Sequence, residues 1–173
     1  MSPILPGAVR QIGYVVTDLD AVIDGWVGMG VGPWFVMRDL QQHVTYRGEP
    51  CSVTLSLAWA NSGDMQIELI NQIDDTPSVY TEFLEIHGEG FNQLCWWTDD
   101  FDATMAAVAE AGWPVVWSGG ADHGQRYAYV EPPAGAAIAE ITARTDALEA
   151  MAELVRGAAV DWDGSDPVRE LGG

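Results

Sequence analysis

The sequence contains no lysine, so seven arginines carry its positive charge against 26 acidic residues. The formal net charge is −19 at pH 7 and the isoelectric point is about 4.1. A nucleic-acid-binding protein needs a basic surface to displace counterions from phosphates, and binding to an anionic membrane needs one too. We therefore expect neither nucleic acid nor a membrane as a partner, and expect a small-molecule substrate or ligand instead.

Cysteine is scarce and long apolar runs are missing. Cys51 and Cys95 are too few for a disulfide framework and lack the spacing of a metal or redox motif. No apolar run approaches the roughly 20 residues of a membrane-spanning helix. The first ten residues lack the charged and apolar regions of a signal peptide. These absences predict a cytoplasmic protein.

What is present is the composition of a globular protein. The 173 residues are 48% hydrophobic and 19% charged, which is enough apolar material to bury a core. The length suits one compact domain or two small fused repeats.

The chain repeats itself. Residues 11–21 align with residues 93–103, an offset of 82 that places residue 11 on residue 93. Each segment reads as an apolar strand, an aspartate-rich turn that can cap a helix, and the start of that helix. Identical residues occupy four of the aligned positions: Gln11/Gln93, Asp18/Asp100, Asp20/Asp102 and Ala21/Ala103.

A second, fainter alignment completes the repeat. Residues 66–69 resemble residues 138–141, and the alignment places Glu68 on Glu140. Each segment reads as the last strand of its half, so the chain predicts two β-α-β-β-β units. We expect their boundaries at 1–87 for the first unit with a bridging helix, 88–143 for the second, and 144–173 for a helix and tail.

The predicted elements follow from hydrophobic periodicity and turn residues. Helices are expected at 19–29, 78–86, 101–111 and 145–160. Residues 40–50 read as a loop or irregular hairpin, and residues 162–173 read as loose. Strands are expected at 10–17, 33–38, 51–60, 65–71, 92–98, 114–118, 125–131 and 137–142. The predicted fold class is α+β, with two tandem repeats that form curved mixed sheets around a shared pocket, plus a C-terminal helix.

Two carboxylates interrupt the apolar strands at equivalent places. Glu68 and Glu140 each follow apolar neighbours in the last strand of a half. A carboxylate buried there costs free energy unless it is paired, bound to metal or protonated. A lone strand glutamate usually faces solvent, but the recurrence of two glutamates with Gln11 and Gln93 favours a common site.

The paired units resemble the vicinal oxygen chelate superfamily, which includes glyoxalase I, methylmalonyl-CoA epimerase, extradiol dioxygenases and bleomycin-resistance proteins. The resemblance covers about residues 9–143 and is closest to the glyoxalase/epimerase-like branch. The segments that carry it are QIGYVVTDLDAVIDGW at 11–26, GVGPWF at 30–35, QIELINQ at 66–72 and SVYTEFLEIHGEGFNQLCWWTDDFDAT at 78–104.

The resemblance implies a metal held by the first and last strands of each half. Carried over position by position, its four ligands fall on Gln11, Glu68, Gln93 and Glu140. Glutamine at the first position has precedent in the family, whereas position 93 is normally histidine. Two carboxylates and two amides suit Mn²⁺ or Mg²⁺ better than Zn²⁺. The alternative is a site without metal, in which the glutamates share a proton or bond to the amides.

Two functional hypotheses follow. The first is an isomerase, epimerase or lyase in which Glu68 and Glu140 move a proton next to a carbonyl of a small molecule. The second is a non-catalytic protein that binds or sequesters a cationic, aromatic small molecule. Dioxygenase chemistry is not expected, because its iron needs two histidines and a carboxylate.

Five further residues are candidates for substrate binding. They are aromatic side chains predicted to line the pocket and the arginines on or beside strands: Trp97, Trp59, Tyr46, Arg47 and Arg126. Arginine can hold a carboxylate, carbonyl or phosphate group. Members of the superfamily often pair, so the resemblance also implies a homodimer.

Overall fold

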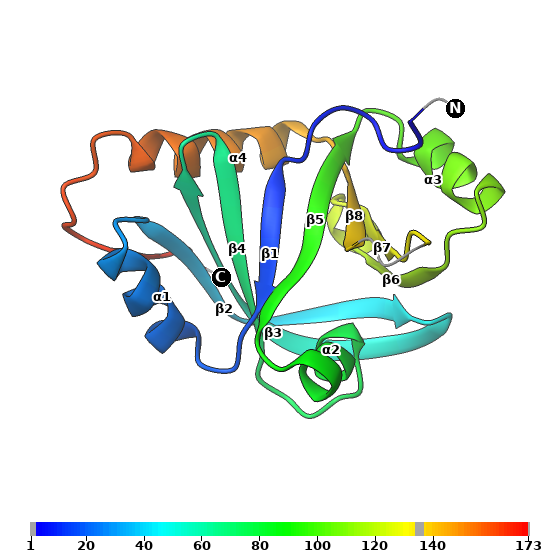
Figure 1. Cartoon of the computed structure of the whole chain (residues 1–173), viewed down its shortest axis with the longest axis horizontal. Coiled ribbons are helices and arrows are strands. Elements are labelled where there is room, and N and C mark those ends of the chain that lie inside the picture. Colours follow the sequence, from blue (N-terminus) through cyan, green and yellow to red (C-terminus); the bar gives the residue numbers. More distant parts are fainter. Residues whose placement is uncertain (1–2, 134–136, 173) are drawn as a thin grey trace.

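The computed structural model describes residues 3–133 and 137–172 (Figure 1). Within those residues the chain forms four α-helices, a short 3-10 turn and nine strands. In chain order the elements are β1 (Gln11–Val15), α1 (Leu19–Gly28), β2 (Trp34–Tyr46), β3 (Glu49–Ser62), β4 (Met65–Gln72), α2 (Val79–His87), β5 (Gly90–Thr98), α3 (Phe101–Glu110), β6 (Val115–Gly119), the 3-10 turn (Ala121–His123), β7 (Tyr127–Val130), β8 (Ile138–Ala143), α4 (Asp146–Ala159) and β9 (Val168–Glu170).

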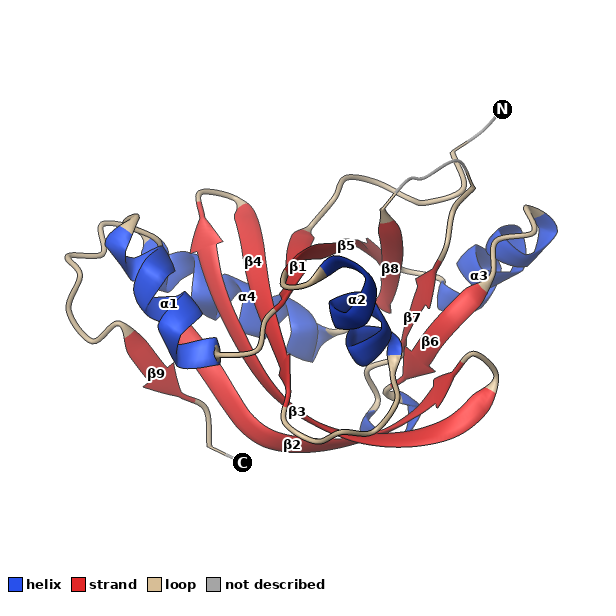
Figure 2. Ribbon diagram, turned by 60° about the horizontal axis from the view of Figure 1, so that its bottom comes forward, coloured by secondary structure: helices blue, strands red, loops and turns tan. Residues whose placement is uncertain are grey.

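The strands form one curved mixed sheet in the order β3-β4-β1-β5-β8-β7-β6-β2-β9. Strand β2 also pairs with β3, so eight strands close into a ring, and β9 pairs with the first residues of β2 on the edge opposite β3. Each half contributes one parallel pair, β1 with β4 and β5 with β8, and the halves join through the antiparallel pair β1–β5. Helices α1 and α3 lie at opposite ends of the molecule (Figures 1 and 2). The predicted fold class is confirmed.

The first helix of each half begins in the same way. The side chain of Asp18 accepts a hydrogen bond from the backbone N–H of Ala21 at 3.0 Å, and Asp100 accepts one from Ala103 at 2.9 Å. The two caps have φ of −129° and −130° and ψ of 92° and 90°. The carboxylates satisfy N–H groups that have no partner within the helix. The predicted aspartate caps are confirmed in both halves.

The core is divided between the inside and the outside of the curved sheet. Alternate strand residues point to opposite faces, so a strand can contribute side chains to a cluster on each face of the sheet. Inside, Val15, Leu55, Ile70 and Trp117 are buried together. Outside, one apolar cluster lies under α1 and another under α3. The inner cluster leaves part of the concave face to polar residues, where the candidate site lies.

Residues 40–50, expected to be a loop or irregular hairpin, form an irregular hairpin, because β2 runs on to Tyr46 and β3 begins at Glu49. The side chains of β2 from Leu40 onward alternate between more and less exposed, as in a half-buried strand. The register with β3 shifts between Met37 and Leu40, which marks a bulge. A tight turn with positive φ at Arg47 and Gly48 then leads directly into β3.

The predicted loose tail is wrong. Residues Val168–Glu170 form β9, which pairs in parallel with Trp34–Val36 of β2. Arg38 bonds to Glu170 through its Nε at 3.0 Å and adds an ion pair to this attachment. The helix predicted at 145–160 is confirmed as α4. In the described part of the chain, no helix has the length and apolar character that a membrane crossing requires.

Candidate functional site

The register of β1 with its neighbours brings the two halves together. Gly13 pairs with Glu68 of β4 on one side and with Gln93 of β5 on the other. One residue further along the same face, Cys95 of β5 pairs with Gln11 on one side and Glu140 on the other. The four positions expected from the sequence therefore lie on one concave face of one continuous sheet.

Gly13 makes room for Gln93. A Cβ atom at position 13 would lie 2.1 Å from the Nε2 of Gln93, far inside van der Waals contact. The side chain of Gln93 is fully buried, so it has no free space to which it can move. The absence of a side chain at Gly13 is thus what allows the Gln93 amide to cross β1 and reach Glu68.

The Gln93 amide is the centre of a buried hydrogen-bond network. Its Nε2 donates to Oε2 of Glu68 at 3.3 Å and to the hydroxyl of Tyr129 at 3.2 Å. The indole Nε1 of Trp59, which pairs with Glu68 across β3 and β4, donates to Oε1 at 2.9 Å. Both oxygens of Glu68 therefore accept hydrogen bonds from fixed donors.

Glu140 is less completely bonded. Its Oε1 accepts from the hydroxyl of Thr142 at 2.9 Å. Its Oε2, like Oε1 of Gln93, is buried and has no hydrogen-bond partner among the described residues. Buried oxygens without partners are costly, so these two atoms are available to a proton, a metal ion or a substrate.

The pKa of each buried glutamate is raised. Burial, which penalises the charged form, is the main cause for Glu68, and the charge of Glu140 adds to it, while the Trp59 hydrogen bond opposes the rise. Burial also raises the pKa of Glu140, and the hydrogen bond from Thr142 opposes the rise. Carboxyl groups with such raised pKa values can carry a proton near neutral pH.

A cavity of about 210 Å³ opens onto both carboxylates. Its wall combines amide, carboxylate and aromatic side chains of the sheet with three apolar residues of α4, which lies across one end of the sheet (Figure 1). Larger surface hollows of about 790 and 610 Å³ contain neither glutamate. The lining residues include the polar, aromatic and α4 side chains of Gln11, Gln66, Glu68, Glu140, Trp59, Trp97, Tyr80, Tyr127, Tyr129, Leu148, Met151 and Ala152.

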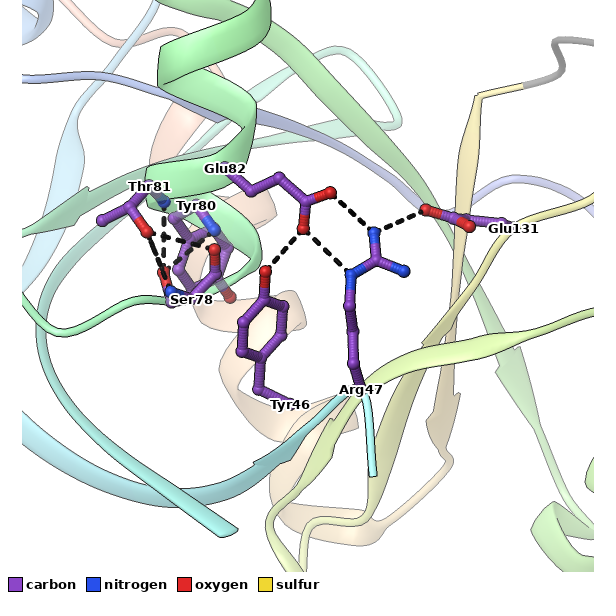
Figure 3. Close-up of polar contacts among 7 residues, drawn as sticks. All are labelled: Tyr46, Arg47, Ser78, Tyr80, Thr81, Glu82 and Glu131. Atoms are coloured by element: carbon purple, nitrogen blue, oxygen red, sulfur yellow. Dashed lines mark hydrogen bonds and ion pairs between the residues drawn. The ribbon is translucent and has the colours of Figure 1, made fainter. Parts of the chain in front are cut away.

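Three of the sequence candidates lie away from this cavity. Figure 3 shows Arg47 between Glu82 and Glu131, with its Nη2 at 2.7 and 3.3 Å from their oxygens. The Tyr46 hydroxyl donates to the same Glu82 at 2.6 Å. Both residues therefore link the end of β2 to α2 rather than contacting the central carboxylates.

Arg126 lies in the hollow of about 790 Å³ on the outer surface. Its Nη2 lies 2.8 Å from the carboxylate of Asp102, and its Cζ lies over the ring of Phe101, 4.4 Å from the ring centroid. The structure places Arg126 in a different hollow from Glu68 and Glu140, whereas Trp59 and Trp97 line the central cavity.

The structure adds tyrosines that the sequence analysis missed. Tyr129 pairs with Glu140 across β7 and β8, as Trp59 pairs with Glu68 in the first half. The alternation of Tyr127 and Tyr129 with alanine was a signal that could have found both. Tyr80 comes from α2 and lies 3.1 Å from the Tyr129 hydroxyl, a contact that only tertiary packing creates.

The donor set bears on the metal ion that the resemblance implies. Two carboxylates and two amides offer only oxygen ligands, of which Glu140 Oε2 and Gln93 Oε1 are buried without partners. Oxygen sets of this kind fit Mg²⁺ or Mn²⁺ rather than Zn²⁺. The described residues hold no cluster of three or more His, Cys, Asp or Glu that could bind a metal, so any ion here would depend on the amides.

A comparison with known protein families identifies the family of this chain. The model of the glyoxalase/bleomycin resistance protein/dioxygenase superfamily matches residues 10–129, more than half of the chain. The chain belongs to this superfamily. No curated protein sequence matches it.

Several solved structures are similar to this chain in fold, at low sequence identity. Methylmalonyl-CoA epimerase from Mycobacterium tuberculosis is 22% identical with a TM-score of 0.58, over 87% of this chain and 95% of the epimerase. A variant epimerase from Streptomyces coelicolor, in complex with 2-nitronate-propionyl-CoA, is 20% identical with a TM-score of 0.56, over 80% and 94%. A hypothetical protein from Bacillus halodurans is 16% identical with a TM-score of 0.55, over 80% and 95%. At these identities the likeness establishes the fold alone.

Proposed function

We propose that this protein is a glyoxalase/epimerase-like enzyme, an isomerase, epimerase or lyase that moves a proton next to the carbonyl of a small molecule. The observation that carries the proposal is the pair of buried carboxylates, Glu68 and Glu140, which reach one cavity from the two halves of the chain. Their raised pKa values suit groups that take up and return a proton.

The hydrogen bonds favour different roles for the two glutamates. Trp59 and Gln93 hold both oxygens of Glu68 in place, whereas Glu140 has one oxygen without a partner. In this proposal one carboxylate removes the proton and the other returns it. Gln11 lines the cavity and donates one amide N–H to Gln66, so its second N–H can stabilise the negative charge that develops on the substrate oxygen, whereas Gln93 already donates to Glu68 and Tyr129.

A divalent ion is a further part of the proposal. Glu68, Glu140 and the amide oxygens of Gln11 and Gln93 would hold Mg²⁺ or Mn²⁺, with Zn²⁺ less suited to the set. When bound, the ion polarises a carbonyl as a Lewis acid. The alternative without metal leaves this task to the amide N–H groups.

The test is proton exchange measured in D₂O. We expect the protein to catalyse deuterium incorporation next to the carbonyl of at least one member of a panel of small ketones, oxo acids and aldehydes, followed by ¹H NMR. Glu68→Gln and Glu140→Gln each remove one proton carrier and should lower the rate by about 10² or more. The exposed Glu110→Gln variant serves as the matched control and should retain the rate.

Metal content is measured on the same samples, prepared without and with chelator. Stoichiometric Mg²⁺ or Mn²⁺ that is lost in both glutamate variants would support the four-residue site. Exchange that survives chelation would support proton transfer by the carboxylates and amides alone. No exchange with any carbonyl compound, with or without added ions, would reject the enzyme proposal.

A second candidate is a non-catalytic binding protein of the same fold. The aromatic wall of the cavity, which includes Trp59, Trp97 and Tyr80, favours it, because such side chains bind planar or cationic small molecules. Binding of one ligand molecule per site without any chemical conversion of the ligand would distinguish this function from catalysis. We also propose, from the family resemblance, that the protein is a cytoplasmic homodimer, and light scattering in solution tests its assembly.

A further inference from the structure

Arg10 differs from the other arginines in having no acidic partner. Among the described residues no carboxylate lies within 4.0 Å of its guanidinium, although the chain has 26 acidic residues. The remaining six arginines are each ion-paired: Arg38 with Asp20, Arg47 with Glu82, Arg126 with Asp102, Arg144 with Asp99, Arg156 with Glu153 and Arg169 with Asp166.

Arg10 is exposed and stacks on a residue that lines the central cavity. It directly precedes β1, and its Cζ lies 4.5 Å from the centroid of the Trp97 ring. Trp97 is 6% exposed and lines the central cavity. A guanidinium stacked on an aromatic face keeps its N–H donors free at its edge, where they match the two oxygens of a carboxylate.

A small hollow lies beside Arg10, next to the central cavity. It measures about 50 Å³, and it shares Gln66, Trp97 and Ala152 with the central cavity. This volume is of the order of one or two water molecules, which is about the room that a carboxylate group needs. Arg10 therefore lies beside a hollow whose wall, formed in part by Gln66 and Trp97, is shared with the cavity that contains Glu68 and Glu140.

The acidic residues that border this hollow do not neutralise Arg10. Glu149 contacts Arg144 and Glu153 contacts Arg156. The side chain of Asp64 is 99% exposed, and its nearest basic partner is Arg156 at 3.9 Å. Arg10 thus offers the unpaired positive charge of this rim.

Helix α4 limits the size of the molecule that can be bound. Leu148, Met151 and Ala152 recur at helical spacing and line the central cavity. The resulting volume, about 210 Å³, is below the range of about 300–1,000 Å³ that is typical for drug-sized ligands. The cavity therefore suits a compact molecule.

We infer that Arg10 binds a carboxylate of the substrate, and that the substrate is a compact carbonyl acid whose carbonyl end faces Glu68 and Glu140. The inference rests on the proposed function for the carbonyl, but the binding role of Arg10 does not depend on turnover. Arg10 is then the residue that selects acids over uncharged carbonyl compounds of the same shape.

The test compares 2-oxobutyrate with its uncharged isostere 2-oxobutanamide. Binding is followed by the indole N–H signals in ¹H–¹⁵N NMR spectra, with the Trp97 signal assigned through Trp97→Phe. We expect the parent protein to bind the acid about tenfold more tightly than the amide, because a charge-assisted hydrogen bond distinguishes them. Arg10→Gln should abolish this preference, because it should weaken the binding of the acid and leave the binding of the amide unchanged. Arg10→Lys should restore part of the preference.

Arg38→Gln is the matched control, since it removes the same charge from an arginine that is ion-paired with Asp20 and lines neither the central cavity nor the hollow beside Arg10. It should keep the parent preference. Equal binding of acid and amide by the parent, an unchanged preference in Arg10→Gln, or no binding of either probe would overturn the inference. If Arg10→Gln loses the preference but the parent protein catalyses no deuterium exchange, the Arg10 site is retained and the proposed function is rejected. If the parent protein catalyses exchange but shows no preference for acids, the proposed function is retained and the Arg10 site is rejected.

Discussion

At the scale of single residues, the site depends on a position that has no side chain. Gly13 lies between Glu68 and Gln93 in the sheet. Its single hydrogen lets a fully buried amide cross the strand and bond to a carboxylate of the other half. The contact between the two repeats therefore requires glycine here for reasons of space rather than backbone conformation.

Replacing Gly13 by alanine tests this directly. The added methyl group would overlap the Gln93 amide, and overpacking of a buried site costs typically about 1–3 kcal/mol. We expect the free energy of unfolding in urea to fall by that amount and the Gln93–Glu68 hydrogen bond to be lost.

Gly25→Ala is the control for the change itself. Gly25 lies within α1, and no atom lies within 4 Å of the place where its Cβ would sit. Alanine should stabilise this helix by about 0.5–1 kcal/mol. Equal effects of the two substitutions would contradict the argument from space.

Trp59→Phe removes the indole donor to Glu68 and keeps an aromatic ring in place. An acceptor left without its buried donor costs about 1–3 kcal/mol. The bond favours the charged form of Glu68, whose pKa is already raised by burial. The loss of stability in urea should therefore be larger at pH 8 than at pH 5, and a loss that does not change with pH would count against this role.

The sequence reveals the glutamates but not their surroundings. A carboxylate in an apolar strand is conspicuous because it is costly to bury, and its recurrence in a second repeat located the site. Gln93 over Gly13, Tyr80 from α2 and unpaired Arg10 depend on tertiary contacts that no local pattern encodes. For the same reason Arg47 and Arg126 looked like substrate ligands, although acidic partners from distant segments engage them.

At the scale of elements, the two halves start their first helices with the same cap. Asp18→Ala and Asp100→Ala should each lower the free energy of unfolding by about 0.5–2 kcal/mol, since each removes one side-chain cap. The pair of losses in urea unfolding should agree within about 0.5 kcal/mol and should add in the double variant. A clear loss at only one of the two caps would show that the repeats are not equivalent at this point.

Most elements were predictable because apolar periodicity and cap residues mark them. The exceptions have physical reasons. The outer half of β2 carries polar residues such as Gln41 and His43 on its exposed face, so its alternation is weak in sequence and is supported by pairing with β3. Strand β9 has only three residues, and its existence depends on the neighbouring backbone of β2.

At the scale of the whole molecule, the buried carboxyl pair makes stability depend on pH. Above about pH 4.5, the ordinary value for glutamate, the unfolded chain releases protons that the folded chain retains at Glu68 and Glu140. Stability is therefore full at lower pH and falls as pH rises through the raised pKa values, by up to about 1.4 kcal/mol per pH unit for each group. Urea unfolding between pH 5 and pH 8 should show this decline.

The measurement is made in chelator and at high salt, so that metal binding is prevented and the repulsion among surface charges is screened. The double variant Glu68→Gln/Glu140→Gln should be markedly less sensitive to pH over the same range. An equally steep decline in the double variant would assign the effect to other groups.

The closed ring of strands bears on how copies of this protein can assemble. Strand β2 pairs with β3 on one side and with β6 and β9 on the other, so the ring uses its own backbone groups internally. Within the described residues each strand of the ring has a neighbour on both sides along at least part of its length, which limits the backbone that a second copy could extend. A dimer of this chain would therefore rely largely on contacts between side-chain surfaces.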